Sequence, residues 1–252
     1  MSDVTEAPAP AEPSPHHLRR SETAARGVTP VGFAVAILCF FFTFNAVSCN
    51  TDAAKQTLHT AAGITGSPTG TAAVDSCLDA LNSVSLFSYT GIDLAFGSAP
   101  EALTTIPTAC RNSQQGLTPS ASPPRPAQAA LGVQALALLA FVACCLGLLI
   151  GVALLVWPRR ARPVLPAAAL LAVAALVALT IDQSRVQGAV LTRIDALAAG
   201  SGAPFSLAGY FTQRSGIAFF LALVALGLVA ITALGHWVMA SRPPAHAIRA
   251  PD

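Results

Sequence analysis

Four long runs of apolar residues, none with a charged side chain, constrain this chain more than any other feature. They cover residues 29–48, 129–157, 164–181 and 216–240. A bilayer core of about 30 Å needs about 20 apolar residues in a helix, because every backbone N–H and C=O group must be paired without water. With 54% hydrophobic and only 10% charged residues, the chain lies outside the range of soluble globular domains. We therefore predict an all-α membrane protein built on a bundle of four transmembrane helices.

Arginines cluster beside the span ends on one side of the predicted membrane. These arginines are Arg19, Arg20, Arg26, Arg159, Arg160, Arg162, Arg242 and Arg249. Short cytoplasmic segments retain positive charge during insertion, so both termini are expected in the cytoplasm and the chain in the plasma (inner) membrane. Trp157 and Trp237 end two of the spans on the same side, where indole rings anchor helices at the membrane interface.

This topology assigns each part of the chain to a span or to one side of the membrane. The predicted segments are a disordered cytoplasmic tail (1–28), a first span (29–48), an extracytoplasmic cap (49–128), a second span (129–157), a cytoplasmic turn (158–163), a third span (164–181), a second outer loop with a helical extension (182–215), a fourth span (216–240) and a cytoplasmic tail (241–252). The long first outer loop and the extended third helix together are expected to form the small cap.

The first outer loop is too long for a plain connector and has the pattern of a small folded unit. Helical spacing is present at residues 55–62 and 72–84, and residues 84–89 favour a strand or extended segment. The loop also holds three of the six cysteines. In an oxidising compartment we expect a Cys77–Cys110 disulfide and a free thiol at Cys49, although pairing of Cys49 with either partner stays open. Residues 46–48 before Cys49 also resemble a lipoprotein cleavage box, which leaves lipidation of this cysteine open.

The second outer loop continues the helical periodicity of the third span. Apolar residues recur at three- and four-residue intervals from Gln183 to Ala199, before a Gly- and Pro-containing turn. Either the third helix extends outward and covers the cap, or this segment lies flat at the membrane interface.

Few polar groups lie within the predicted spans. Asn45 and Gln134 are expected to form hydrogen bonds between helices, with ligand binding as the alternative. Small residues at Ala143, Gly147 and Gly151 repeat every four positions, so that another helix can approach closely, either in the same bundle or in a homodimer.

The sequence contains none of the patterns that usually carry catalysis. It lacks a phosphate-binding loop, a dinucleotide fingerprint, a nucleophile elbow and a Cys-x-x-Cys pair. Its histidines are dispersed, so no metal site is expected. Asp75 and Asp79 could face a cation or a substrate, but we expect them to be solvated charges on the surface of a helix. We predict no catalytic, cofactor-binding or metal-binding residues, and the scattered basic residues exclude a nucleic-acid face.

Two strings are familiar: Phe40–Cys49, which closes the first span, and Tyr89–Gly97, which contains Thr-Gly-x-x-Leu-x-x-Gly. They resemble uncharacterised bacterial, chiefly actinobacterial, four-span membrane proteins. The resemblance implies this architecture and no particular activity.

Our leading hypothesis is a non-enzymatic integral membrane protein that contacts a protein or an envelope component through its cap. Besides the lipid bilayer, its expected partners are another protein or further copies of itself. Two alternatives remain: an accessory subunit of a transporter or channel, and a membrane enzyme that acts on thiols or lipids through Cys49 or the loop carboxylates.

Overall fold

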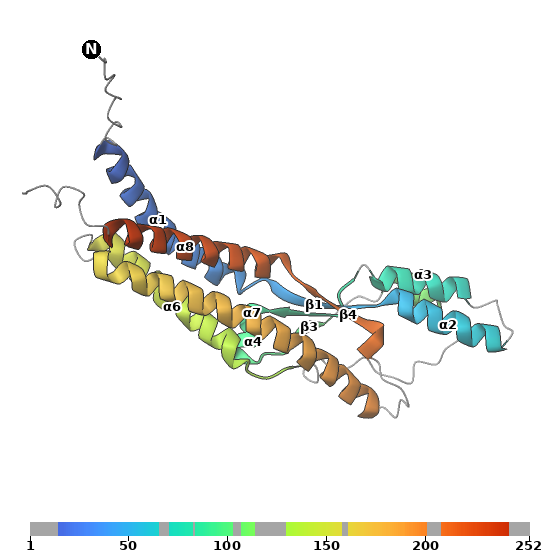
Figure 1. The fold of residues 1–252 in the computed structure, drawn as a ribbon. Coiled ribbons are helices and arrows are strands. Elements are labelled where there is room, and N and C mark those ends of the chain that lie inside the picture. The colour runs from blue at the N-terminus through green and yellow to red at the C-terminus, as the bar shows by residue number, and fades with distance from the viewer. Residues whose placement is uncertain are drawn as a thin grey trace, which may run out of the picture.

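The fold has two parts, a bundle of long helices and a small sheet with short helices at one end of it (Figure 1). A computed structural model describes the chain. The residues described are 15–65, 71–82, 84–102, 107–113, 130–157, 161–200 and 208–241.

Three helices are long and apolar enough to cross a membrane. They are α6 (Ala135–Val156), α7 (Ala161–Gly200) and α8 (Ile217–Ser241). The 22 residues of α6 give a length of about 33 Å, which matches the hydrocarbon thickness of a bilayer. Large aliphatic side chains on these helices point outward, as lipid-facing residues do: Leu149, Leu170 and Ile231 are each 66–70% exposed. The chain therefore has the character of a multi-pass membrane protein.

The first predicted span differs from the structure. Helix α1 (Pro15–Cys39) ends nine residues before the predicted limit at residue 48, and its apolar part is only Gly27–Cys39. A turn at Phe40–Phe42 then leads into a strand, β1 (Thr43–Cys49). The prediction of one helix over 29–48 was wrong at its outer end, because an apolar run does not distinguish a helix from a strand that is buried between neighbours.

Helix α1 nevertheless belongs to the bundle, where it packs against α6 and α8. The predicted small-residue stripe of α6 forms this contact. Ala143, Gly147 and Gly151 are buried, and a Cβ atom on Gly151 would lie 2.9 Å from the Cα atom of Pro30 in α1. At Gly147 a Cβ atom would overlap the ring of Phe33. The stripe thus packs within the chain, and a homodimer through it would have to displace α1.

Four antiparallel strands form a sheet in the order β3-β2-β1-β4. Besides β1, the strands are β2 (Phe87–Thr90), β3 (Glu101–Ala102) and β4 (Phe211–Ser215), and β3 and β4 form the two edges of the sheet. The sheet corrects the all-α prediction. Within it β1 is central, with Asn45 opposite Tyr89 on one side and Ser215 on the other. Its backbone is paired along both edges, so this apolar segment satisfies its polar groups without being a helix.

Short helices complete the part of the fold beyond the bundle. They are α2 (Thr51–Thr65), α3 (Thr71–Asn82), α4 (Gly91–Phe96), α5 (Thr108–Ser113) and a 3-10 turn at Ala208–Tyr210. The helices expected at residues 55–62 and 72–84 are present, although α3 ends at Asn82, and the strand or extended segment expected at residues 84–89 contains the start of β2, which runs to Thr90. Figure 1 shows α2 and α3 side by side at the far end of the molecule from the start of α1.

Helix α7 is continuous through 40 residues, about 60 Å. Its outer half packs on the sheet, with Val186 and Val190 fully buried. The predicted continuation of the third helix through residues 183–199 is confirmed, and its position relative to the membrane interface stays a prediction. Apolar residues every three to four positions gave α7 the buried stripe that this packing requires.

Several predictions fall outside the described residues. They concern residues 1–14 of the predicted disordered tail, residues 114–128 of the predicted cap, residues 158–160 of the predicted cytoplasmic turn and the end of the chain after residue 241. Residues 15–28 of the tail, in contrast, form the start of α1 in place of the predicted disorder. The arginines on which the orientation was predicted belong to these segments or to positions whose side chains are not described.

Candidate functional site

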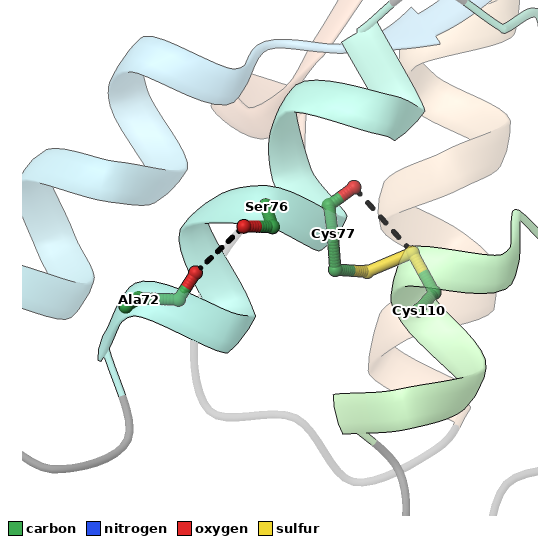
Figure 2. The surroundings of a disulfide bond; sticks show 4 residues. All are labelled: Ala72, Ser76, Cys77 and Cys110. Carbon is green, nitrogen blue, oxygen red and sulfur yellow. Dashed lines mark hydrogen bonds between the residues drawn. A yellow bond between two sulfur atoms is a disulfide. The ribbon is translucent and has the colours of Figure 1, made fainter.

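The unit farthest from the bundle is a set of three helices, two of which are joined by a disulfide. Cys77 of α3 and Cys110 of α5 are bonded, which confirms the predicted pair (Figure 2). Cys110 is buried, and the Ser76 hydroxyl donates back to the Ala72 carbonyl along α3. We call α2, α3 and α5 the stapled unit.

Two side-chain contacts between a basic residue and a carboxylate join α2 to α3 in the stapled unit. The Lys55 ammonium donates to the Asp79 carboxylate, and His59 Nε2 lies 3.5 Å from Asp75 Oδ2. The hydrogen bond to Asp79 raises the pKa of Lys55. Both carboxylates therefore face basic groups of the neighbouring helix, which fits a role in holding the helix pair together rather than a cation site.

A buried amide pair connects the sheet to α7. Asn45, which is completely buried, donates to the Gln183 side-chain oxygen at 2.9 Å, and Gln183 donates to the Asn45 oxygen at 2.7 Å. Gln183 also donates to the Ser215 hydroxyl at 2.7 Å. Hydrogen bonding was expected for Asn45, but between two helices; here it joins strand β1 to a helix. Gln134 instead donates locally, to the Leu131 carbonyl, just before α6 begins.

One buried carboxylate marks the level at which α6 begins. Asp182 of α7 is 4% exposed and accepts a hydrogen bond from the backbone N–H of Ala137, in the first turn of α6. The free N–H groups at a helix start favour a negative charge, so this contact stabilises both helices where they meet. Sequence reasoning missed this role, because Asp182 was assigned simply to the start of the second outer loop.

The segments Phe40–Cys49 and Tyr89–Gly97 lie against each other. The Ile92 N–H donates to the Phe40 carbonyl at 2.9 Å, and Thr43 lies opposite Thr90 in the sheet. A Cβ atom on Gly91 would lie 2.9 Å from the Cα atom of Phe40, so the close approach requires glycine there.

A capping box starts α4 within the second string. The Thr90 hydroxyl oxygen accepts from the Asp93 N–H at 3.1 Å, and the Asp93 carboxylate accepts from the Thr90 N–H at 3.0 Å. Gly97 ends the helix with φ at +71°, in the left-handed region that favours glycine. The Thr-x-x-Asp spacing is a sequence signal for this cap that our reading did not use.

No family model, curated protein or solved structure matches this chain.

An open groove of 490 Å³ lies between the outer half of α7 and the chain just before α6. Its lining is Ala130, Leu131, Gly132, Ala189, Thr192, Arg193 and Ala196. The Arg193 charge also acts on Tyr89 of β2, where burial raises the pKa to about 12 and the arginine partly counteracts this effect. The groove combines small apolar side chains with one hydroxyl and one guanidinium.

Cys49 ends β1 as a free, half-buried thiol. Burial raises its pKa, which disfavours the thiolate that a nucleophile or redox catalyst needs. Among the described residues, no group of three or more His, Cys, Asp or Glu side chains could hold a metal ion.

The predicted interface anchors lie at one end of the bundle, away from the sheet (Figure 1). Trp157 follows the last turn of α6, and Trp237 lies in the last turns of α8. They are 64% and 46% exposed, as residues that contact a membrane interface would be. Their contact with lipid headgroups stays a prediction.

Proposed function

We propose that this chain is a non-enzymatic membrane protein that presents its stapled unit, outside the cytoplasm, to another protein or an envelope component. The disulfide in that unit is the observation that carries the proposal. Disulfides persist in oxidising compartments and are rare in the cytosol, so a structural Cys77–Cys110 bond favours an extracytoplasmic location. In this arrangement α1 crosses the bilayer as the fourth span and both termini are cytoplasmic.

A rigid, protruding helix pair suits recognition. The disulfide and the pairs formed by Lys55 and His59 hold α2, α3 and α5 together without a large core. A surface fixed before binding loses less conformational freedom when a partner docks. Catalysis by the Cys49 thiol is disfavoured by its burial, which supports a binding role over an enzymatic one.

The side of the membrane is tested with an S98C variant, because Ser98 is exposed beside the sheet. In sealed cells an impermeant maleimide is expected to label S98C above the wild-type background and without permeabilisation. Labelling that appears only after the membrane is opened would place the stapled unit in the cytoplasm and refute the proposal.

The partner surface is tested by photocrosslinking in living cells. Photoreactive residues replace the exposed Gln56 of α2 and Asn82 of α3, with Ser98 as a control beside the sheet and Leu170 and Ile231 as controls on the lipid-facing side. A discrete product from positions 56 and 82 alone, which is lost when the disulfide is removed, supports the proposal. A product from positions 170 and 231 alone would favour the accessory subunit of a transporter or channel. Equal products, or none, would refute a partner on the stapled unit.

A further inference from the structure

We propose that the turn at Phe40–Phe42 and helix α4 lie inside the hydrocarbon layer of the bilayer, where the exposed rings of Phe41, Phe42 and Phe96 contact lipid acyl chains. The topology expected from the sequence placed α4 in the cap, outside the membrane. The proposal requires that the long helices cross the bilayer. It does not depend on the side of the membrane on which the stapled unit lies, or on what that unit binds.

Helix α6 supplies a depth scale for the bundle. Its 22 residues match the thickness of the hydrocarbon layer, so one edge of that layer lies near Ala135. Helix α1 runs antiparallel to α6, because Gly151 faces Pro30 at one end of the contact and the Phe40 and Phe141 rings meet at the other, with centroids 5.2 Å apart. At 1.5 Å per residue, Phe141 lies about 9 Å from Ala135 toward the bilayer centre. The turn that begins at Phe40 therefore lies well inside the hydrocarbon layer.

The length of α1 leads to the same level. Its apolar part, Gly27–Cys39, is about 20 Å long, which is about 10 Å too short to cross the layer alone. The turn and the first residues of β1, at about 3.3 Å per strand residue, supply the difference. Asn45 of β1 then reaches Gln183, which directly follows the Asp182 that contacts the first turn of α6. The crossing that starts in α1 is thus completed by a turn and a strand.

Helix α4 packs against α6 at this end of the bundle (Figure 1). The Ile92 N–H donates to the Phe40 carbonyl at 2.9 Å, and the Leu94 carbonyl accepts at 2.9 Å from the N–H of the residue that precedes α6. The centroid of the Phe96 ring lies 5.8 Å from that of Phe141. Helix α4 therefore occupies the interval between the turn and the edge of the hydrocarbon layer.

Large aromatic side chains are exposed at this level. Phe41, Phe42 and Phe96 are 53–63% exposed. Phe96 adjoins α6, and the exposed Phe220 belongs to the first turn of α8, so this surface is continuous with the outward-facing apolar surface of the long helices. Acyl chains cover such a surface at no cost, whereas water would leave it unburied.

The polar groups of these segments are compatible with hydrocarbon. Irregular backbone occurs at membrane depth only where its polar groups are paired within the protein. The Phe42 N–H donates to the Cys39 carbonyl at 3.0 Å. The Asp93 carboxylate, the charged group of α4, accepts from the N–H and the hydroxyl of Thr90 at 3.0 and 2.7 Å.

Fluorescence quenching in phosphatidylcholine vesicles with brominated acyl chains measures the depth of these rings in the full chain. A W157F/W237F background removes both native tryptophans, and F42W or F96W adds a single reporter. L146W, on the exposed side of α6 near the bilayer centre, is the deep reference, and Q56W, on the exposed side of α2, is the aqueous reference.

We expect bromines to quench F42W and F96W about as strongly as L146W and to leave Q56W almost unchanged. Bromines near the headgroup end of the chains should quench F42W more than bromines near the methyl end, and L146W should show the reverse order. Thermal unfolding equal to that of the W157F/W237F parent shows that a reporter leaves the fold intact, and F41W replaces F42W if it does not.

Acrylamide, a quencher dissolved in the water, distinguishes the other environments. It should quench Q56W strongly and F42W and F96W weakly. Strong acrylamide quenching of either ring position without a bromine effect would place that ring in water and overturn the proposal. Quenching by neither reagent would mean that protein covers the rings, and would overturn the proposal in favour of a contact between copies of the chain. None of these results depends on the maleimide labelling or on the crosslinks from α2 and α3.

Discussion

The Asn45–Gln183 amide pair allows a quantitative test of how the sheet is fixed to the helix bundle. The perturbations are N45L and Q183M, which keep side-chain size and remove the amide, alone and together. Q183M leaves the completely buried Asn45 amide without its two hydrogen bonds of 2.7 and 2.9 Å, whereas N45L leaves the half-buried Gln183 amide with its hydrogen bond to the Ser215 hydroxyl.

The expected magnitudes follow from the burial of Asn45. A buried polar group without a partner costs about 1–3 kcal/mol in addition to the lost hydrogen bond, so Q183M should lower the free energy of unfolding by about 2–4 kcal/mol. N45L should cost less, because the Gln183 amide that it leaves behind is half-buried and keeps one partner. The double variant leaves neither amide behind, and only the Ser215 hydroxyl loses its donor. It should therefore be less destabilised than the sum of the single variants by about 2 kcal/mol.

Equilibrium unfolding in mixed micelles, followed by circular dichroism, measures these differences. Q187M is the matched control, because Gln187 is exposed one turn farther along the same helix, and it should change stability by less than about 0.5 kcal/mol. Strictly additive single variants, or a Q183M effect no larger than that of Q187M, would refute the reasoning.

Three further predictions concern packing, the disulfide and a buried phenol. G151A should destabilise the detergent-solubilised protein by about 1–3 kcal/mol through overpacking against α1, whereas G227A, which has open space around it, should be neutral or stabilising; thermal unfolding compares the two. C110S should cost about 3–4 kcal/mol, the loop entropy for a separation of 33 residues, and should speed proteolysis of the stapled unit; cleavage rates equal to those of the wild type would contradict this. The pKa of Tyr89, at about 12, lies above its unfolded value of about 10, so its stabilising contribution is complete below pH 10 and is lost between pH 10 and 12; phenolate absorbance of a Y210F variant should rise near pH 12 and not near pH 10.

The sequence was most informative where one local pattern dominates. Helices α6 and α8 follow from uninterrupted apolar runs, and the length of α7 follows from its continued helical periodicity. The Cys77–Cys110 bond was predictable because Cys49 lies at the predicted edge of the membrane. These features need no knowledge of distant contacts.

Features that depend on distant contacts were missed. The segment from Thr43 to Cys49 is apolar enough for a helix, but it pairs with strands about 45 and 165 residues away, and no local signal encodes those partners. The same reason applies to Asn45, whose expected hydrogen bond was correct in kind but whose partner, Gln183, lies 138 residues away. The link between Asp182 and the start of α6 likewise exists only after α6 and α7 have packed together.

The connections between the sheet and the bundle have a mechanical consequence. Strand β4 passes into α8 through Gly216 alone, whose N–H donates to the Phe44 carbonyl, and β1 follows α1 after a turn of three residues. The part beyond the bundle consequently lacks a hinge at these two crossings. A force applied there by a bound molecule would tilt or rotate α1 and α8 directly, so a load on the sheet would pass into the helix bundle without being absorbed by a flexible joint.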